Sequence, residues 1–235
     1  NRATEAELRF PGRTETIRGP PSIATMVDLR CPGTGRSAEP PTVRLNELMR
    51  ALCFSLVMLA TAGLQASEPW PAFRGPSADG HASSDALPLE WSETGNVVWK
   101  TPIHGRGWSS PVVWGNRIWM TTATEDGREL SAVCVDLESG RILHDFVMFE
   151  VEEPRDTRQF NSFASPTPVI EEGRVYLSCG SYGLACLDSE SADVIWVRRD
   201  LECNHWRGPG SSPILYDGML ILHYDGYDFQ YVVAL

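Results

Sequence analysis

The sequence predicts an all-β fold built from repeated four-stranded units, and three observations support this. The spacing Asp-x-x-[Ser/Thr]-Gly-x-x-x-Trp recurs, with departures, at residues 91–99, 136–144 and 188–196. A Ser/Thr-Pro pair recurs in phase with it at Ser110, Thr167 and Ser212, followed each time by an apolar pair, a turn and a β-rich run. No amphipathic helix of useful length follows residue 66. A period of 45–57 residues with strand-like content is typical of radially repeated or stacked β-units.

Each unit is expected to hold four short strands. In the first unit, residues 112–113 and 117–122 flank a Gly-Asn turn, which is the chemistry of a hairpin. A third strand, residues 130–135 here and 184–187 in the next unit, ends at the aspartate, and a fourth ends at the tryptophan position. The intervening turn suits an aspartate side-chain cap and a glycine at positive φ. Three residues depart from the pattern, namely Trp91 for Asp, His144 for Trp and Ala192 for Gly.

Composition and charge exclude several classes of protein. The 235 residues are 42% hydrophobic and 22% charged, with a formal net charge of −11. These values exclude an acidic disordered tail, a collagen-like chain and a multi-span membrane protein. We expect no nucleic-acid partner, because phosphate binding requires a basic face. The first 66 residues carry +2 and the remainder −13, and all eight tryptophans follow residue 66.

The N-terminal part is expected to lie outside the repeated fold. Residues 1–48 are aperiodic and rich in Pro, Gly and Arg, which predicts a disordered or non-native extension ahead of a start at Met49. Residues 49–66 have the form of a signal peptide, with Arg50, an apolar run and a small residue before the cut. A single anchor helix is the alternative. The prediction is an exported chain, periplasmic or extracellular, with no membrane span once mature, whose fold occupies residues 67–235.

The repeat resembles that of the pyrroloquinoline-quinone (PQQ) type of β-propeller over roughly residues 70–235, and the opening Trp70-Pro71-Ala72-Phe73-Arg74-Gly75-Pro76 is similar to the start of secreted bacterial members. That family includes quinoprotein dehydrogenases, the propeller lipoprotein of the outer-membrane barrel-assembly machinery and kinase-associated propellers. The resemblance implies a partial PQQ-like propeller of about three to three and a half four-stranded blades. Since propellers close with 4 to 8 blades, we expect the reading frame to continue into further repeats.

The resemblance also implies which residues join neighbouring blades. A tryptophan of this motif docks between blades, where it buries a large area and still places its N–H on a carbonyl. The residues expected in this blade-docking motif are Trp99, Asp136, Gly140, Asp188 and Trp196.

The family holds two kinds of function, and both remain open at this point. Quinoprotein dehydrogenases hold PQQ over two adjacent cysteines, with a calcium ion nearby, but this sequence has no adjacent cysteine pair. We therefore expect no cofactor, metal or catalytic residue, and a non-catalytic exported propeller that serves as an interaction or assembly platform for a protein partner. The alternative is a quinoprotein-like oxidoreductase whose PQQ and calcium site is completed by further blades.

Several side chains remain as candidates for chemistry. Cys203, His205, Trp206 and Arg207 cluster a thiol, an imidazole, an indole and a guanidinium in one loop. This loop is either functional, for example through a Cys–His nucleophile pair, or a Gly/Pro-shaped connection whose Arg207 pairs with a carboxylate.

Three further segments have two interpretations each. Cys179 and Cys186 are expected directly opposite each other across a hairpin with its turn at 182–183, as reduced packing thiols or as a disulfide. The acidic run 150–156 is a solvated insertion or a dock for a basic partner. Residues 223–228 are a polar turn or a set of oxygen and imidazole ligands.

Overall fold

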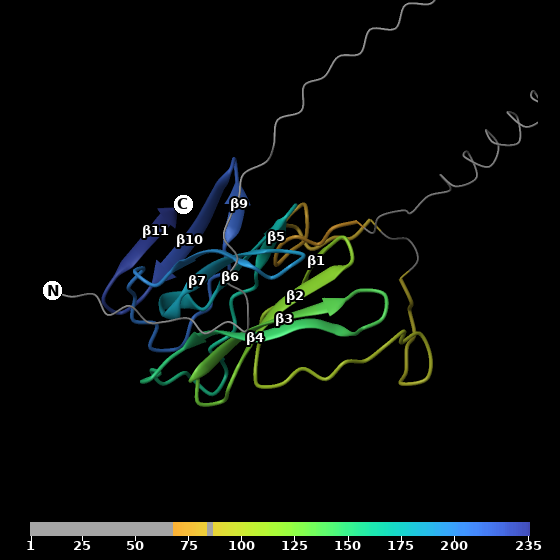
Figure 1. Ribbon diagram of the computed structural model, residues 1–235, viewed down its shortest axis with the longest axis horizontal. Coiled ribbons are helices and arrows are strands. Elements are labelled where there is room, and N and C mark those ends of the chain that lie inside the picture. The colour runs from red at the N-terminus through yellow and green to blue at the C-terminus, as the bar shows by residue number, and fades with distance from the viewer. Residues whose placement is uncertain (1–67, 84–86) are drawn as a thin grey trace, which may run out of the picture. The chain divides into compact units, whose positions relative to one another are not determined.

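The computed structural model describes residues 68–83 and 87–235 of the chain (Figure 1). The chain divides into two units, Asn1–Ala62 and Gly63–Leu235, and every described residue lies in the second. The predicted extension 1–48 and signal peptide 49–66 therefore lie outside the described residues. The elements are β1 (Val112–Trp114), β2 (Arg117–Ala123), β3 (Glu129–Asp136), β4 (Ile142–Glu150), β5 (Val169–Glu171), β6 (Arg174–Ser178), the 3-10 helix η1 (Gly180–Tyr182), β7 (Leu184–Asp188), β8 (Val194–Arg198), β9 (Ile214–Tyr216), β10 (Met219–Asp225) and β11 (Gln230–Ala234).

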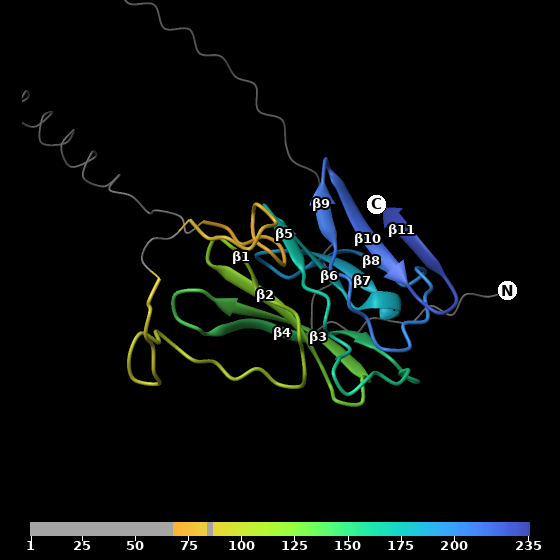
Figure 2. The same ribbon diagram turned by 180° about the vertical axis from the view of Figure 1, so that it is seen from behind.

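The strands form three antiparallel sheets, which follow one another along the chain (Figures 1 and 2). Blade 1 has the order β1-β2-β3-β4, blade 2 the order β5-β6-β7-β8, and blade 3 the order β9-β10-β11. The predicted all-β propeller class is confirmed, with two four-stranded blades and one three-stranded blade in the described part of the chain. No described helix is long and apolar enough to cross a membrane.

The described residues before blade 1, namely 68–83 and 87–111, make no sheet of their own. The first copy of the repeat, ending at Trp99, contributes only an isolated bridge between Ser92 and Gly95. Two more bridges attach this region to blade 1, Trp70 with Val113 and Arg106 with Ala123. Trp99 therefore reaches blade 1 from an extended segment rather than from a fourth strand.

The strand register repeats from blade to blade, as the sequence period predicts. In blades 1 and 2 a register shift follows the third-strand cysteine, so that the turn begins at the same place in both. An extra residue at such a bulge bends the strand and increases its twist. The paired positions are Trp119–Cys134–His144 in blade 1, Tyr176–Cys186–Trp196 in blade 2 and Ile221–Ala234 in blade 3.

The turns between third and fourth strands have the same structure in blades 1 and 2. Asp136 Oδ1 accepts the Ser139 N–H at 2.8 Å, and Asp188 Oδ1 accepts the Ser191 N–H at 2.8 Å. The residue after each serine is left-handed, with φ of 70° at Gly140 and 64° at Ala192. Ala192 thus keeps the backbone of the glycine that it replaces, although its Cβ makes this conformation unfavourable.

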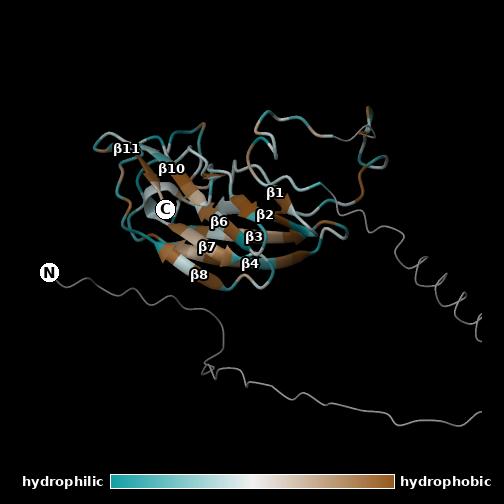
Figure 3. Ribbon diagram, turned by 90° about the horizontal axis from the view of Figure 1, so that it is seen from above, coloured by the Kyte–Doolittle hydropathy of each residue, from teal (hydrophilic) through white to brown (hydrophobic). Residues whose placement is uncertain are grey.

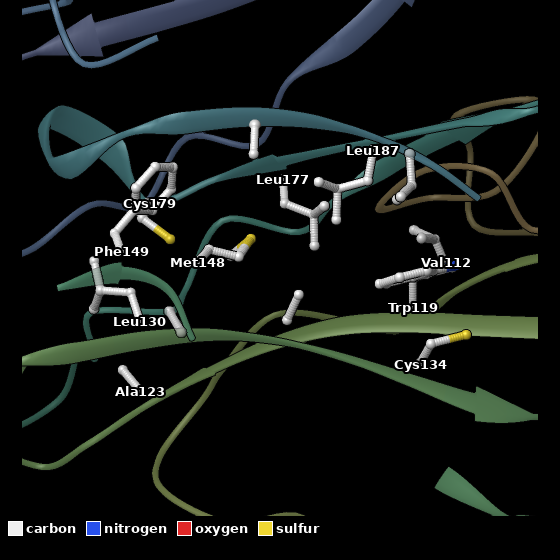
Figure 4. Packing of buried hydrophobic residues seen from close by; sticks show 14 of the residues in the cluster. Val112, Trp119, Ala123, Leu130, Cys134, Met148, Phe149, Leu177, Cys179 and Leu187 are labelled. Atoms are coloured by element: carbon white, nitrogen blue, oxygen red, sulfur yellow. The ribbon is translucent and has the colours of Figure 1, made fainter. Parts of the chain in front are cut away.

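Apolar side chains fill the spaces between successive blades, and Figure 3 shows the apolar colouring concentrated on the strands. Figure 4 shows the side chains of Trp119, Leu130, Phe149 and Leu177 between the ribbons of blades 1 and 2, and all four are fully buried. A second cluster lies between blades 2 and 3 and includes Leu184, Leu220, Leu222 and Tyr224. The blades are therefore joined by continuous apolar packing, which is the main stabilising term for stacked sheets.

The Ser/Thr-Pro markers link the three blades through hydrogen bonds. The Ser110 N–H donates to Thr167 Oγ1 at 3.0 Å, and the Thr167 N–H donates to Ser212 Oγ at 2.9 Å. Thr167 is buried, so its hydroxyl has little access to water as an alternative partner. The repeat marker therefore satisfies backbone groups at the inner entry of each blade.

The prediction that Cys179 lies directly opposite Cys186 across a hairpin is wrong. Cys186 lies opposite Tyr176 and Trp196, because the connection contains η1 and the strands pair from Ser178 with Leu184 rather than around a two-residue turn. All four cysteines of the described region, Cys134, Cys179, Cys186 and Cys203, are free and buried. The first two belong to the cluster between blades 1 and 2, and the other two to that between blades 2 and 3.

Candidate functional site

Trp99 lies against the turn of blade 1. Its indole Nε1 donates to the Leu137 carbonyl at 2.9 Å, and Thr101 Oγ1 donates to the Gly140 carbonyl at 2.5 Å. The ring covers Gly140 so closely that a Cβ added there would stand 2.5 Å from Trp99 Cδ2. Among the predicted docking residues, the structure thus brings Trp99, Asp136 and Gly140 into one contact region.

The turn of blade 2 is held by a residue that the sequence motif did not indicate. Trp119, in the second strand of blade 1, donates from Nε1 to the Ser189 carbonyl at 3.2 Å. His144, which replaces the motif tryptophan, donates from Nε2 to the Glu190 carbonyl at 3.0 Å. Arg117 Nη2 lies 2.6 Å from Glu190 Oε2, which adds an ion pair between the blades. Asp188 itself caps the turn from within blade 2.

Trp196 has a different environment from Trp99. It stacks on Tyr176, with ring centroids 6.0 Å apart and planes tilted by 46°. Both rings line a groove of about 650 Å³ between blades 2 and 3. No described residue accepts a hydrogen bond from the Trp196 indole N–H.

The candidate loop places its thiol and imidazole inside the protein. Cys203 is buried, its Sγ lies 3.6 Å from the accepting Phe229 carbonyl, and the same sulfur lies 3.7 Å from His205 Nδ1. The backbone of Gly226 passes so close that a Cβ there would stand 2.4 Å from the sulfur. His205 stacks on Tyr224 with ring centroids 5.8 Å apart. These contacts give both side chains a packing role.

The protonation states of this pair agree with packing rather than with nucleophilic catalysis. Burial, together with the nearby carboxylates of Asp228 and Asp225, raises the pKa of the Cys203 thiol to about 11. Burial also lowers the pKa of His205 below its ordinary value. At neutral pH the pair is therefore a thiol and a neutral imidazole, whereas a reactive cysteine requires a lowered pKa or an adjacent base.

The indole of Trp206 contacts two guanidinium groups. Arg158 and Arg207 stand over its ring, 4.3 Å and 4.5 Å from the ring centroid, and Tyr227 meets it edge-on at 5.2 Å. Residues 205–208 and 225–227, with Gln230, line an open groove of about 370 Å³, called here the Trp206 groove. Arg207 therefore contacts an aromatic ring, and the predicted pairing with a carboxylate does not form among the described residues.

A segment distant in sequence holds this loop in place. Asn161 Nδ2 donates to the Arg207 carbonyl at 2.7 Å and to the Pro209 carbonyl at 3.2 Å. Arg155 Nη1 donates to the Cys203 carbonyl at 2.9 Å, and the Arg155 N–H donates to the Tyr182 hydroxyl at 2.8 Å. The predicted acidic insertion is therefore anchored at Arg155, while its glutamates Glu152 and Glu153 are exposed.

The described residues do not fit a PQQ and calcium site. Their four cysteines are far apart in sequence, and no group of three or more His, Cys, Asp or Glu side chains in the described regions is arranged to hold a metal ion. The candidate ligands near residue 228 are used locally, since Asp228 Oδ1 accepts the N–H groups of Asn204 at 2.6 Å and Phe229 at 2.8 Å. The predicted polar turn at 223–228 is therefore correct only for its second half, because His223, Tyr224 and Asp225 belong to strand β10 and Tyr224 is buried.

Three comparisons place the chain among known proteins. Residues 83–198 match a family model described as outer membrane protein assembly factor BamB. No curated protein matches the sequence significantly. Similar solved structures include a quinohemoprotein alcohol dehydrogenase from Comamonas testosteroni, with 15% identity and a TM-score of 0.47, covering 74% of this chain and 26% of that one.

Two further structures have lower TM-scores. BamB from Moraxella catarrhalis has 15% identity and a TM-score of 0.40, with 55% of this chain and 38% of that chain covered. A europium-containing methanol dehydrogenase has 14% identity and a TM-score of 0.39, with 53% and 22% covered. The chain thus spans well under half the length of these proteins. The family match over residues 83–198 and the repeated antiparallel blades together support a PQQ-repeat-like β-propeller fragment.

Proposed function

We propose that this chain is an exported, non-catalytic β-propeller that serves as a protein-interaction platform, and that the Trp206 groove is its contact surface. The observation that carries the proposal is the contact of Trp206 with both Arg158 and Arg207, together with the edge-on contact to Tyr227. Tryptophan, tyrosine and arginine are the residues that most often dominate the energy of protein interfaces.

Tyr227, which lines the groove, is an exposed aromatic residue, and two more lie within two residues of Gln230 and Arg158 in sequence. The exposed fractions are 72% for Tyr227, 67% for Phe160 and 51% for Phe229. Large aromatic side chains exposed together, beside charged groups, mark interaction sites more often than chance exposure does. A partner would gain apolar burial from these rings and cation–π or ion-pair contacts from the two guanidinium groups.

The surface is held in place before any partner binds. Asn161 fixes the backbone on both sides of Gly208, and two guanidinium groups pack over the Trp206 ring. Binding to a preorganised surface loses less side-chain entropy than binding to a mobile loop. The buried Cys203 and the half-buried His205 beside this surface act as packing groups, which supports a binding role rather than a catalytic one.

Export is proposed from the sequence of residues 49–66 and from the family match. Residues 49–66 have the form of a signal peptide, although they lie outside the described residues. The family model that matches residues 83–198 is described as an outer membrane protein assembly factor, which supports a role outside the cytoplasm together with a protein partner. No described residue specifically favours the quinoprotein oxidoreductase alternative.

Site-specific photo-crosslinking in the native host tests the platform proposal. A photoreactive residue replaces Tyr227, and the control position is the exposed Glu125 at the β2–β3 hairpin of blade 1. We expect a discrete protein adduct at position 227 that disappears in Trp206→Ala and is absent at position 125. Equal adducts at both positions, or no adduct at 227 in a folded chain, would contradict the proposal.

A further inference from the structure

A segment at the start of the described chain lies across the first strands of blades 1 and 2. Residues 68–80, called here the clasp, contain the motif Trp70-Pro71-Ala72-Phe73-Arg74-Gly75-Pro76, which the proposed function does not use. Figures 1 and 2 both show this segment in orange beside β1 and β5. These two strands are also the ones through which blades 1 and 2 contact each other most extensively. The clasp therefore meets the fold where the two blades converge.

The clasp shares backbone hydrogen bonds with both strands. The Trp70 N–H donates to the Val113 carbonyl of β1 at 2.9 Å, and the Val113 N–H donates back to the Trp70 carbonyl at 2.8 Å. One residue later, the Ile170 N–H of β5 donates to the Pro71 carbonyl at 2.9 Å. Ile170 is buried, so this carbonyl satisfies an amide that water reaches poorly. Two adjacent clasp residues thus bind two different blades.

Two prolines adapt the segment to this role. Pro69 and Pro71 flank Trp70, and a residue before proline is biased towards the extended backbone that a strand partner needs. The fixed φ of the prolines lowers the entropy that is lost when the segment becomes ordered. Neither proline has an N–H with which to continue a ladder, and the pairing with β1 is an isolated bridge at Trp70. The clasp is therefore a short docking segment and not a further strand of blade 1.

The ring of Trp70 folds the clasp back on itself. It covers Gly75 so closely that a Cβ added there would stand 2.7 Å from Trp70 Cζ3, and Gly75 has φ of 75°. The Gly75 N–H donates to the Ala72 carbonyl at 3.0 Å, and the Gly80 N–H donates to the Arg74 carbonyl at 2.9 Å. Ala72 also packs on the apolar cluster between blades 2 and 3. The motif thus encodes a compact unit whose shape requires glycine at position 75.

The contacts of the clasp are separate from those that hold each blade together. Three backbone hydrogen bonds join it to β1 and β5, and they use the edges of these strands that face away from β2 and β6. A segment held by few bonds opens locally at a lower free-energy cost than the sheets beneath it. Undocking of the clasp therefore uncovers the edges at Val113 and Ile170 without breaking a strand pair in either blade.

We propose that the edges of β1 and β5 form a peptide-binding slot whose ligand is the clasp, an extended segment with a tryptophan between two prolines that ends in the turn at Gly75. The clasp docks and undocks as a unit, and in its docked state it couples blades 1 and 2. The chain's own segment is the occupant because it supplies the acceptor for Ile170 and both backbone partners of Val113. The slot shares no residue with the Trp206 groove, so it holds or fails independently of the proposed function.

Amide hydrogen exchange on the full 235-residue chain tests the slot. Gly75→Ala places a Cβ against the Trp70 ring, and we expect the Val113 and Ile170 amides to exchange at least about tenfold faster, while amides paired between β2 and β3 keep their rates. Gly80→Ala is the matched control, because its φ is 84° but the nearest atom to the added Cβ is Arg74 Nε at 3.9 Å. In this control both amides are expected to exchange as slowly as in the unaltered chain.

A synthetic peptide of residues 68–80 tests recognition of the ligand. Added in excess to Gly75→Ala, it is expected to restore slow exchange at Val113 and Ile170, whereas the same peptide with Trp70→Ala is expected not to. Should Gly75→Ala unfold, exchange of the unaltered chain in low denaturant remains decisive, since the two amides are expected to open together before those of β2 and β3. Opening only together with β2 and β3, unchanged rates in a folded Gly75→Ala, or a peptide that restores nothing would each overturn the proposal.

Discussion

The indole of Trp119 stacks on the imidazole of His144, with ring centroids 5.9 Å apart and planes within 8° of parallel. Both rings donate to the same turn of the next blade, at the carbonyls of Ser189 and Glu190. Trp119, a buried residue of the second strand of blade 1, thus supplies the indole that the motif places at the end of the fourth strand. In this turn Ala192 has the position that Gly140 has in the turn of blade 1, where the glycine lies against the indole of Trp99. The two departures from the motif, His144 for Trp and Ala192 for Gly, therefore occur in the same contact.

Gly140→Ala is expected to destabilise the chain by about 2–4 kcal/mol. An alanine there has to adopt φ of 70°, and its Cβ would stand 2.5 Å from the ring of Trp99. Backbone strain and overpacking therefore act together. Gly173→Ala is the matched control, because its φ is 75° but no atom lies within 4 Å of the added Cβ. Denaturant unfolding measures both, and equal losses of stability in the two variants would disprove the close contact with Trp99.

Thr167→Val is expected to cost about 1–3 kcal/mol of stability, since the Ser110 N–H loses its acceptor at a buried position. Thr167→Ser keeps the hydroxyl and is expected to lose only the smaller contribution of one methyl group. Thermal or denaturant unfolding of the two variants distinguishes the effects. A valine variant as stable as the serine variant would show that the hydrogen bond between blades 1 and 2 contributes nothing measurable.

Cys203 is expected to resist alkylation at pH 7–8 in the folded chain. Its pKa is raised to about 11 by burial, so the reactive thiolate is scarce until the pH approaches that value. Cys134, Cys179 and Cys186 are buried too, with thiol pKa values raised to about 12, 12 and 11. Peptide mapping after iodoacetamide treatment, with and without denaturant, reports each site. Rapid labelling of Cys203 alone near pH 6–7 would indicate an activated nucleophile and contradict its packing role.

His205 is expected to make stability depend on pH just below neutrality. Burial lowers its pKa below 6.5, so the unfolded chain binds more protons than the folded chain between the folded value and 6.5. Its contribution is therefore complete above about pH 6.5 and is lost as the pH falls through this window. Unfolding curves between pH 5 and 8 measure the slope, which His205→Gln removes and the exposed control His81→Gln retains. A slope unaltered in His205→Gln would assign the effect to another group.

Local patterns were sufficient to predict the blades. The Ser/Thr-Pro markers and the Asp136 and Asp188 turns depend on residues a few positions apart, and the register repeats as their spacing requires. The error at Cys179 arose because η1 lengthens a connection that the sequence allowed to be a two-residue turn. The residues around Trp119 in the sequence do not indicate whether its indole packs within its own blade or binds the turn of the next blade.

The Trp206 groove could not be assembled from sequence, because its parts come from distant segments. Arg158, Trp206 and Tyr227 meet only after blades 2 and 3 have placed their connections side by side. The sequence indicates the loop around Cys203 as a candidate, but the partners of its side chains are not predictable from it. The Phe229 carbonyl and the ring of Tyr224, rather than a substrate, determine the chemistry of its thiol and imidazole.

The most direct test of the central claim, that this propeller binds proteins and does not catalyse a quinone-dependent reaction, is a calorimetric titration of the full chain with PQQ in the presence of Ca²⁺. Dye reduction with alcohols and sugars is measured on the same samples. The account predicts no stoichiometric binding and no dye reduction. One-to-one binding of PQQ that depends on Ca²⁺ and supports dye reduction would contradict it and establish the oxidoreductase alternative.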